Sequence, residues 1–293
     1  MFAARGGFFA QPNYATGGTV STANIGGTVY TIHTFTANGT FTVNTPTLSV
    51  DYLIVGGGGA GGASGGGGGQ VVQANASSKT SGSYTVVVGA GGLRSSGGSE
   101  PTVGDISSVF GTNAVGGGAG YTSSQTYTDR DGASGGGGAG TSAGAPGSGG
   151  NAPGNTTAGQ YAGGYGNVNG GFSMGGGGGG AGQVGGNAVN GPTDDYGGAG
   201  GNGITSSING TSTYYAGGGG GIAIISTGDT GAGGVGGAGG GGDGGIRYIS
   251  GGTNANATPG TVNSGGGGGG GDTSSIQVGQ NGGSGIVIIR YPS

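Results

Sequence analysis

The sequence predicts an all-β protein in which a β-domain is joined to a large bundle of polyglycine II helices, with essentially no α-helix. The first observation is that 94 of the 293 residues are Gly, so much of the chain has no side chain with which to fill a conventional core. The second is that only 5% of residues are charged and the net charge is -4, which gives the chain no electrostatic reason to stay expanded. The third is that the glycines cluster in tracts and only 8 residues are Pro, which excludes the regular repeat of collagen.

The large apolar residues are concentrated toward the two ends of the chain. Residues 28–110 and 272–293 together predict the β-domain, which the C-terminal strand completes. The glycine-dominated residues 111–271 predict an inserted polyglycine II bundle that carries surface loops. Residues 1–27 fall outside both parts and are assigned to an N-terminal attachment arm.

The strands of the β-domain can be placed in order along the chain. Residues 28–35 and 40–43 flank an Asn-Gly pair, which is the strongest short-range signal for a β-hairpin. Residues 48–55 alternate between apolar and polar side chains and end in a continuous apolar run, which predicts a strand covered on both faces at its end. Further strands are expected at residues 70–74, 84–88 and 106–110.

The most hydrophobic run of the chain lies at residues 286–291. A strand this apolar must be paired inside a sheet, and the only apolar partners lie before residue 110. The two ends of the β-domain are therefore expected to meet.

The glycine tracts between these ends are expected to be core elements. A polyglycine II helix has three residues per turn and no internal hydrogen bonds, so its amides and carbonyls point outward. Neighbouring helices can hydrogen bond only where no Cβ separates them, and ordering each Gly costs about 0.5–1 kcal/mol more than ordering Ala. Nearly every backbone group must then be paired, which requires a bundle. The tracts lie at 116–118, 135–138, 175–180, 197–201, 217–221, 236–245 and 265–271.

Two motifs resemble enzyme sites without meeting their requirements. Residues 51–61 match a strand followed by the glycine fingerprint of dinucleotide-binding proteins, but no helix and no acidic residue follow at the required spacing, so no cofactor is expected. Residues 62–66 and 132–136 match the G-x-S-x-G elbow of hydrolases by chance in a chain rich in Gly and Ser. The only histidine, His33, lies in a predicted strand. We therefore expect no catalytic residues and no enzymatic activity.

The sequence also predicts no metal site, no nucleic-acid binding and no membrane insertion. Asp129 and Asp131 resemble the start of a calcium loop, but the Glu that completes such a loop is absent and a solvated turn is favoured. Six Lys and Arg residues cannot form the basic surface that phosphate neutralisation requires, so nucleic acid is not expected. No apolar run approaches the ~20 residues of a membrane span, and the start lacks the pattern of a secretory signal.

Aromatic and charged residues in the segments between the tracts are the candidates for a binding surface. Tyr among Ser, Asn and Gly is typical of adaptable binding loops, although tyrosines could instead simply cover the ends of the glycine helices. The candidate surface-binding residues are Tyr121, Tyr127, Asp129, Arg130, Asp131, Tyr161, Tyr165, Asp194, Asp195, Tyr196, Tyr214, Tyr215, Arg247 and Tyr248.

Several phrases of the sequence resemble a known protein type. They are Tyr52-Leu53-Ile54-Val55 before a glycine run, Tyr84 to Gly92, Ser108-Val109-Phe110-Gly111, Tyr215-Ala216 before Gly217, and the ending Gly282 to Tyr291. Over residues 28–293 these phrases resemble the glycine-rich domain proteins of marine bacteriophages, and the architecture is similar to that of polyglycine II adhesins at phage tail-fibre tips. The resemblance implies a tail-fibre or spike component that is synthesised in the host cytoplasm and displayed on the surface of the virion.

Three functional hypotheses follow. The leading one is a non-enzymatic virion appendage protein that binds other virion proteins or copies of itself and contacts a bacterial surface glycan or outer-membrane protein. The alternative is a purely structural protein, a self-assembling fibre or a capsid decoration without receptor binding. A third is ice binding by a flat polyglycine II face, against which the irregular spacing of the tracts argues.

Overall fold

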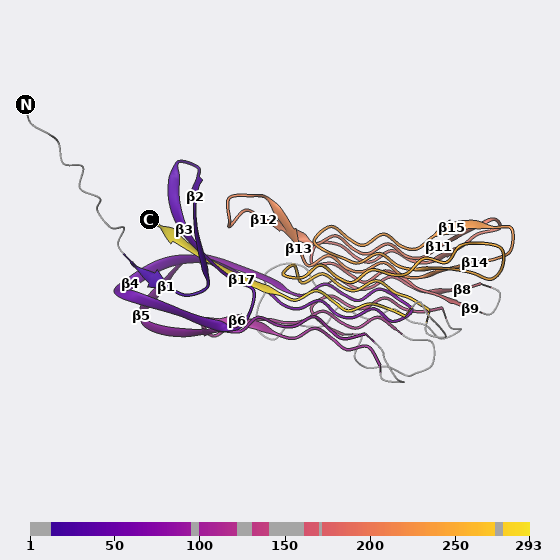
Figure 1. The fold of residues 1–293 in the computed structure, drawn as a ribbon, viewed down its shortest axis with the longest axis horizontal. Helices are drawn as coiled ribbons and strands as arrows, with labels where there is room; N and C mark the ends of the chain where they lie inside the picture. Colours follow the sequence, from indigo (N-terminus) through magenta and orange to yellow (C-terminus); the bar gives the residue numbers. More distant parts are fainter. Residues whose placement is uncertain (1–12, 95–99, 122–130, 141–160, 170–171, 273–277) are drawn as a thin grey trace, which may run out of the picture.

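The computed structural model describes residues 13–94, 100–121, 131–140, 161–169, 172–272 and 278–293. The molecule is elongated, with a β-domain at one end and extended tracts that run side by side along the long axis (Figure 1). Every regular element in the described ranges is a β-strand, which confirms the all-β prediction. Within the same ranges the chain forms no helix capable of crossing a membrane.

The β-domain is built on one curled antiparallel sheet of six strands. Its strand order is β1-β4-β17-β3-β2, and β5 also pairs with β4. The central strand β17 follows the last glycine tract in sequence, and its partners β3 and β4 precede the first tract, so the two ends of the domain meet as predicted. The strands are β1 (Ala15–Thr16), β2 (Thr19–Ile25), β3 (Thr28–Phe35), β4 (Gly39–Val55), β5 (Val71–Val86) and β17 (Ile286–Pro292).

The structure differs from the expected strand boundaries in several places. β4 is one strand over Gly39–Val55, whereas the sequence predicted separate strands at 40–43 and 48–55. β5 is one continuous strand that follows β4 through two register shifts, whereas the sequence predicted separate strands at 70–74 and 84–88. Its middle is polar and exposed on both sides, so no hydrophobic pattern marks it. β1 and β2 lie within residues 1–27, which were expected to form an arm, but they pair with β4 and β3. The sheet therefore begins at Ala15.

The described ranges also contain eleven short strands, β6 to β16, which lie between the tracts in sequence and have only two or three residues each. They pair as β6–β7, β8–β9, β10–β11–β15, β12–β13 and β14–β16. Their bounds are β6 (Ser107–Val109), β7 (Thr112–Ala114), β8 (Asn167–Asn169), β9 (Phe172–Met174), β10 (Val189–Asn190), β11 (Asp194–Tyr196), β12 (Ile204–Ser206), β13 (Thr213–Tyr215), β14 (Ala223–Ile225), β15 (Thr230–Ala232) and β16 (Ile246–Tyr248).

The glycine tracts form a polyglycine II lattice, which is visible in the period of their hydrogen bonds. In the buried tract 56–62, every third amide donates to the same neighbouring tract, as a helix with three residues per turn requires. The donor and acceptor pairs are Gly56–Gln70, Gly59–Gly67 and Gly62–Ser64 toward one neighbour, Gly57–Asp105 and Ala60–Thr102 toward a second, and Gly58–Gly283 and Gly61–Gln280 toward a third. One tract is thus held from three directions.

The same period recurs throughout the bundle, with both parallel and antiparallel neighbours. Gly175, Gly178 and Ala181 donate to an antiparallel tract, whereas Gly197, Gly200 and Gly203 donate to a parallel one. The lattice includes residues 56–69, so it extends beyond the range 111–271 that the sequence assigned to it.

Close approach of backbones explains why the tracts are glycine. A Cβ added at Gly58 would lie 2.0 Å from the carbonyl oxygen of Gly266, and one at Gly66 would lie 2.2 Å from that of Gly59. Non-bonded carbon and oxygen atoms do not approach this closely, so a side chain at these positions would force the tracts apart.

Three apolar clusters hold the parts together. The first lies within the β-domain and contains Phe35 and Phe41. The second joins the sheet to the lattice, because Leu53 and Ile288 pack there with Ala216. The third lies in the bundle and contains Met174, Ile222 and Ile224, with Ala63, Ala139 and Ala188.

The buried His33 predicts a pH dependence of stability. Its Nδ1 lies 2.7 Å from the carbonyl oxygen of Gly17, to which it donates, and its Nε2 lies 3.2 Å from the hydroxyl of Tyr291. Burial lowers the pKa of this imidazole below its ordinary value of 6.5, although the bond to Gly17 partly opposes the shift. Below pH 6.5 the unfolded chain therefore gains a proton that the folded chain resists.

We expect the free energy of unfolding to fall as the pH drops below 6.5, and a His33→Gln variant to lose that part of the fall. Urea titrations of both proteins at pH 7.5 and pH 5 would measure the difference. An equal fall in both proteins would contradict this role of His33.

Candidate surface-binding site

The end of the molecule opposite the β-domain carries a group of small sheets (Figure 1). It consists of β8–β9, β10–β11–β15 and β14–β16, and we call it the distal cap. The sheets form one packed unit, since β14 contacts β9, β11 and β15, and β10 contacts β8. In contrast, β12 and β13 lie at the near end of the bundle (Figure 1).

The distal cap is fixed by the third apolar cluster. Met174 of β9 and Ile224 of β14 are 0% and 2% exposed, and Ile222 at the end of a glycine tract is fully buried. These side chains supply the apolar contacts that the glycines cannot, and they couple the cap to the lattice.

Four aromatic and aliphatic side chains of the distal cap are exposed. Val189 and Tyr196 are directly paired across β10 and β11, so their side chains share one face, and they are 50% and 43% exposed. Tyr165, just before β8, is 57% exposed, and Val168 on β8 is 39% exposed. We call these four residues the distal face. None of them is charged.

Asparagine side chains hold the strands that carry the distal face. The amide of Asn190 donates to the carbonyl of Val168 at 2.6 Å, which ties β10 to β8. The side-chain oxygen of Asn187 accepts from the backbone N–H of Tyr165 at 2.8 Å. These two bonds hold the backbone at Val168 and at Tyr165.

Several predicted residues lie in or beside this region. Tyr165 and Tyr196 belong to the distal face. Asp194 is exposed next to it on β11, where the hydroxyl of Thr230 donates to its Oδ1 at 2.7 Å.

Other predicted residues have structural positions that keep them from a ligand. Asp195 and Tyr215 are only 0% and 4% exposed, because the alternation of a strand turns them inward beside Asp194 and Tyr214. The Oδ2 of Asp195 accepts from the N–H of Ser226 at 3.2 Å and so joins β11 to the end of β14. The prediction that these two residues lie on an exposed binding surface was therefore wrong.

Two further predicted residues, Arg247 and Tyr248, make contacts within the molecule. Arg247 donates from Nη1 to Oδ2 of Asp272 at 2.7 Å, which neutralises its charge. Tyr248 is half-buried, and its ring covers Gly252 so closely that a Cβ there would lie 2.1 Å from it.

The remaining candidates are scattered. Tyr121 is half-buried against the third cluster and its carbonyl accepts from the N–H of Ala63 at 2.7 Å. Tyr161, 37% exposed, belongs to a tract, because its carbonyl accepts from Gly135. Tyr214 is 50% exposed on β13, at the near end. Asp131 is exposed where the next described segment begins, while Tyr127, Asp129 and Arg130 lie outside the described residues.

Sequence reasoning missed Val168 and Val189. Single valines in polar segments give no hydrophobic period, and two-residue or three-residue strands are too short to be predicted from alternation. The only local signal was that each lies near a predicted tyrosine.

The two motifs that resemble enzyme sites are parts of the glycine lattice. All six amides of residues 56–61 donate to carbonyls of other tracts, which leaves none for a pyrophosphate. The hydroxyl of Ser64 donates to the carbonyl of Gly137 at 2.5 Å and accepts from the N–H of Tyr121, so it closes the turn between two tracts. Ser134 is fully buried. The described residues contain no group of three or more His, Cys, Asp or Glu side chains that could hold a metal ion.

A family model described as a glycine-rich domain matches residues 35–292, which is most of the chain. No curated protein matches the sequence. The matched range contains the described glycine tracts and strands β4, β5 and β17, whereas β1, β2 and all of β3 except Phe35 lie outside it.

Proposed function

The chain belongs to the glycine-rich domain family, and on that premise we propose that it is a non-enzymatic virion appendage protein, a tail-fibre or spike component. It is displayed on the particle surface and contacts a bacterial surface glycan or outer-membrane protein through the distal face. Its partners at the opposite end are other virion proteins or copies of itself.

The separation of the two ends of the rod carries this proposal. Asn13 and Ser293, where the described chain begins and ends, line one cavity of the β-domain, whereas the distal face lies at the other end of the lattice (Figure 1). A bundle cross-linked from several directions is a stiff spacer. This arrangement suits a protein that is held at one end and touches a surface with the other.

The chemistry of the distal face suits uncharged or weakly polar surfaces. Tyrosine offers a flat apolar ring with one hydroxyl and loses little entropy on binding, which makes it effective in contact surfaces. Two tyrosines beside two valines can pack against sugar rings or against exposed side chains of a membrane protein. A ligand recognised mainly by charge would not find a partner on these four side chains.

Removal of the two rings tests the proposal. We expect fluorescently labelled protein to bind cells of susceptible strains in a panel of marine bacteria, and a Tyr165→Ser, Tyr196→Ser variant to bind at least about tenfold more weakly. Cells stripped of surface glycan and cells treated with protease would separate the two receptor classes.

The matched control is Tyr214→Ser, which removes a tyrosine of similar exposure at the near end. An equal loss of binding in the control would reject the distal face as the contact surface. Filaments or rings formed by purified protein that binds no strain would instead support the purely structural alternative.

A further inference from the structure

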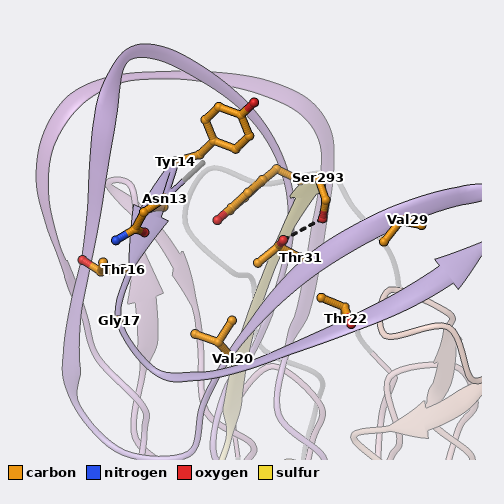
Figure 2. A pocket seen from close by; sticks show the side chains of 11 residues that line it. Asn13, Tyr14, Thr16, Gly17, Val20, Thr22, Val29, Thr31 and Ser293 are labelled. Atoms are coloured by element: carbon orange, nitrogen blue, oxygen red, sulfur yellow. Dashed lines mark hydrogen bonds between the residues drawn. The ribbon is translucent and has the colours of Figure 1, made fainter. Parts of the chain in front are cut away.

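A cavity of about 660 Å³ opens in the β-domain, at the end far from the distal face. Figure 2 shows that it lies between β1 and the β2–β3 hairpin, with the end of β17 as its floor. Tyr14 and Tyr291 meet edge to face there, with ring centroids 6.1 Å apart. The Oγ atoms of Thr31 and Ser293 are hydrogen bonded across the wall at 2.7 Å.

The walls of this cavity select an apolar occupant. No Asp, Glu, Lys or Arg side chain lines it. The aliphatic side chains of Val20 and Val29 stand on its wall and are 55% and 47% exposed, so an occupant would remove them from water. The volume is large enough for one or two aromatic rings.

The chain contains a segment of matching chemistry. Phe2, Phe8 and Phe9 lie in residues 1–12, outside the described residues, and they are three of the 7 phenylalanines of the protein. Phenylalanines of the β-domain are used for burial, since Phe35 and Phe41 are 3% and 0% exposed. Residues 1–12 lead directly to Asn13, which itself lines the cavity.

We propose that the cavity binds Phe8 and Phe9 of a second copy of this chain, so that copies join base to base through exchanged N-terminal segments. The cavity of the same copy is the less favourable target, because Asn13 and Tyr14 form its wall and only three residues separate Asn13 from Phe9, which leaves little chain to turn back into that cavity. Phe9 and Phe8 lie four and five residues before Asn13, so an extended segment carries them about 13–18 Å from it, which reaches a cavity that faces it directly across the junction. Exchange is reciprocal around a two-fold axis, and the distal faces then point away from the junction.

Complementation between two variants tests the exchange. The arm variant is Phe8→Ser, Phe9→Ser, and the cavity variant is Val29→Asp, which places a charged side chain on a wall whose side chains are uncharged. Sedimentation should give twice the 26.5 kDa of one chain for the unmodified protein. Each variant alone should sediment as a monomer, with a dissociation constant raised at least about thirtyfold.

A mixture of the two variants should form a complex, because the intact arm of one copy still meets the intact cavity of the other. Val235→Asp, at a residue 68% exposed and outside the cavity, is the control and should leave the mass unchanged. Circular dichroism verifies that each variant is folded. Three results would each overturn the proposal: an unmodified chain that is monomeric at all concentrations, variants that keep its mass, or a mixture that does not associate. A monomer whose melting temperature falls in the arm variant would show docking within one copy instead.

Discussion

Replacing Gly219 with Ala is expected to destabilise the protein by about 3 kcal/mol or more, at the upper end of what overpacking costs. The new Cβ would lie 2.1 Å from the carbonyl oxygen of Gly268, and that atom belongs to backbone and not to a side chain that could rotate away. The N–H of Gly219 already donates to Gly66, and its carbonyl accepts from Gly178. Separating the tracts would therefore weaken several hydrogen bonds at once. Urea unfolding and amide exchange of the lattice measure the loss.

The control for this prediction is Gly186→Ala, in which the nearest atom to the new Cβ is 3.0 Å away. A small shift accommodates that contact at a modest cost. Ala also lowers the entropy of the unfolded chain, which stabilises the folded state by a similar amount, so the free energy of unfolding should change by no more than about 1 kcal/mol. Equal stability of the two variants would show that the tracts are not held at the spacing described.

Truncation of Ile288 to Ala is expected to cost about 2–5 kcal/mol. Ile288 is 2% exposed on the central strand β17, where it lies opposite Leu53. It packs in the second cluster with Ala216, so the cavity left behind would open at the joint between sheet and lattice. Thermal and urea unfolding report the cost.

Val262→Ala supplies the comparison, because Val262 is 68% exposed and lies outside the cavity of the β-domain, so its truncation should change stability by no more than about 0.5 kcal/mol. If the two truncations cost the same, the second cluster does not hold the sheet to the lattice.

The sheet could be predicted where local pattern decides the structure. The strand predicted at residues 28–35 has the bounds of β3, Thr28–Phe35, and the apolar run at the end of the chain identified β17 as a central strand. The β-hairpin predicted from the Asn-Gly pair was wrong, because β17 lies between β3 and β4 and pairs with both of them. β2 could not be predicted in this way, because most of its side chains are exposed and carry no alternation.

The glycine tracts could be predicted as a bundle, but their neighbours could not. Gly66 donates to Gly268 and Gly67 donates to Gly118, yet no side chain distinguishes these residues in the sequence. Register in the lattice is set by the elements at its ends. For the same reason, the choice between exposed Asp194 and buried Asp195 depended on a three-residue strand that only the folded structure reveals.

The three-residue period of the lattice limits how this protein can change during evolution. An insertion of one residue within a tract would rotate every later amide by a third of a turn and redirect it to the wrong neighbour, whereas an insertion of three would preserve the pairing. The segments that connect the tracts obey no such rule. Genetic variation can therefore accumulate in length and composition at the ends of the tracts while the interior accepts changes only in whole turns.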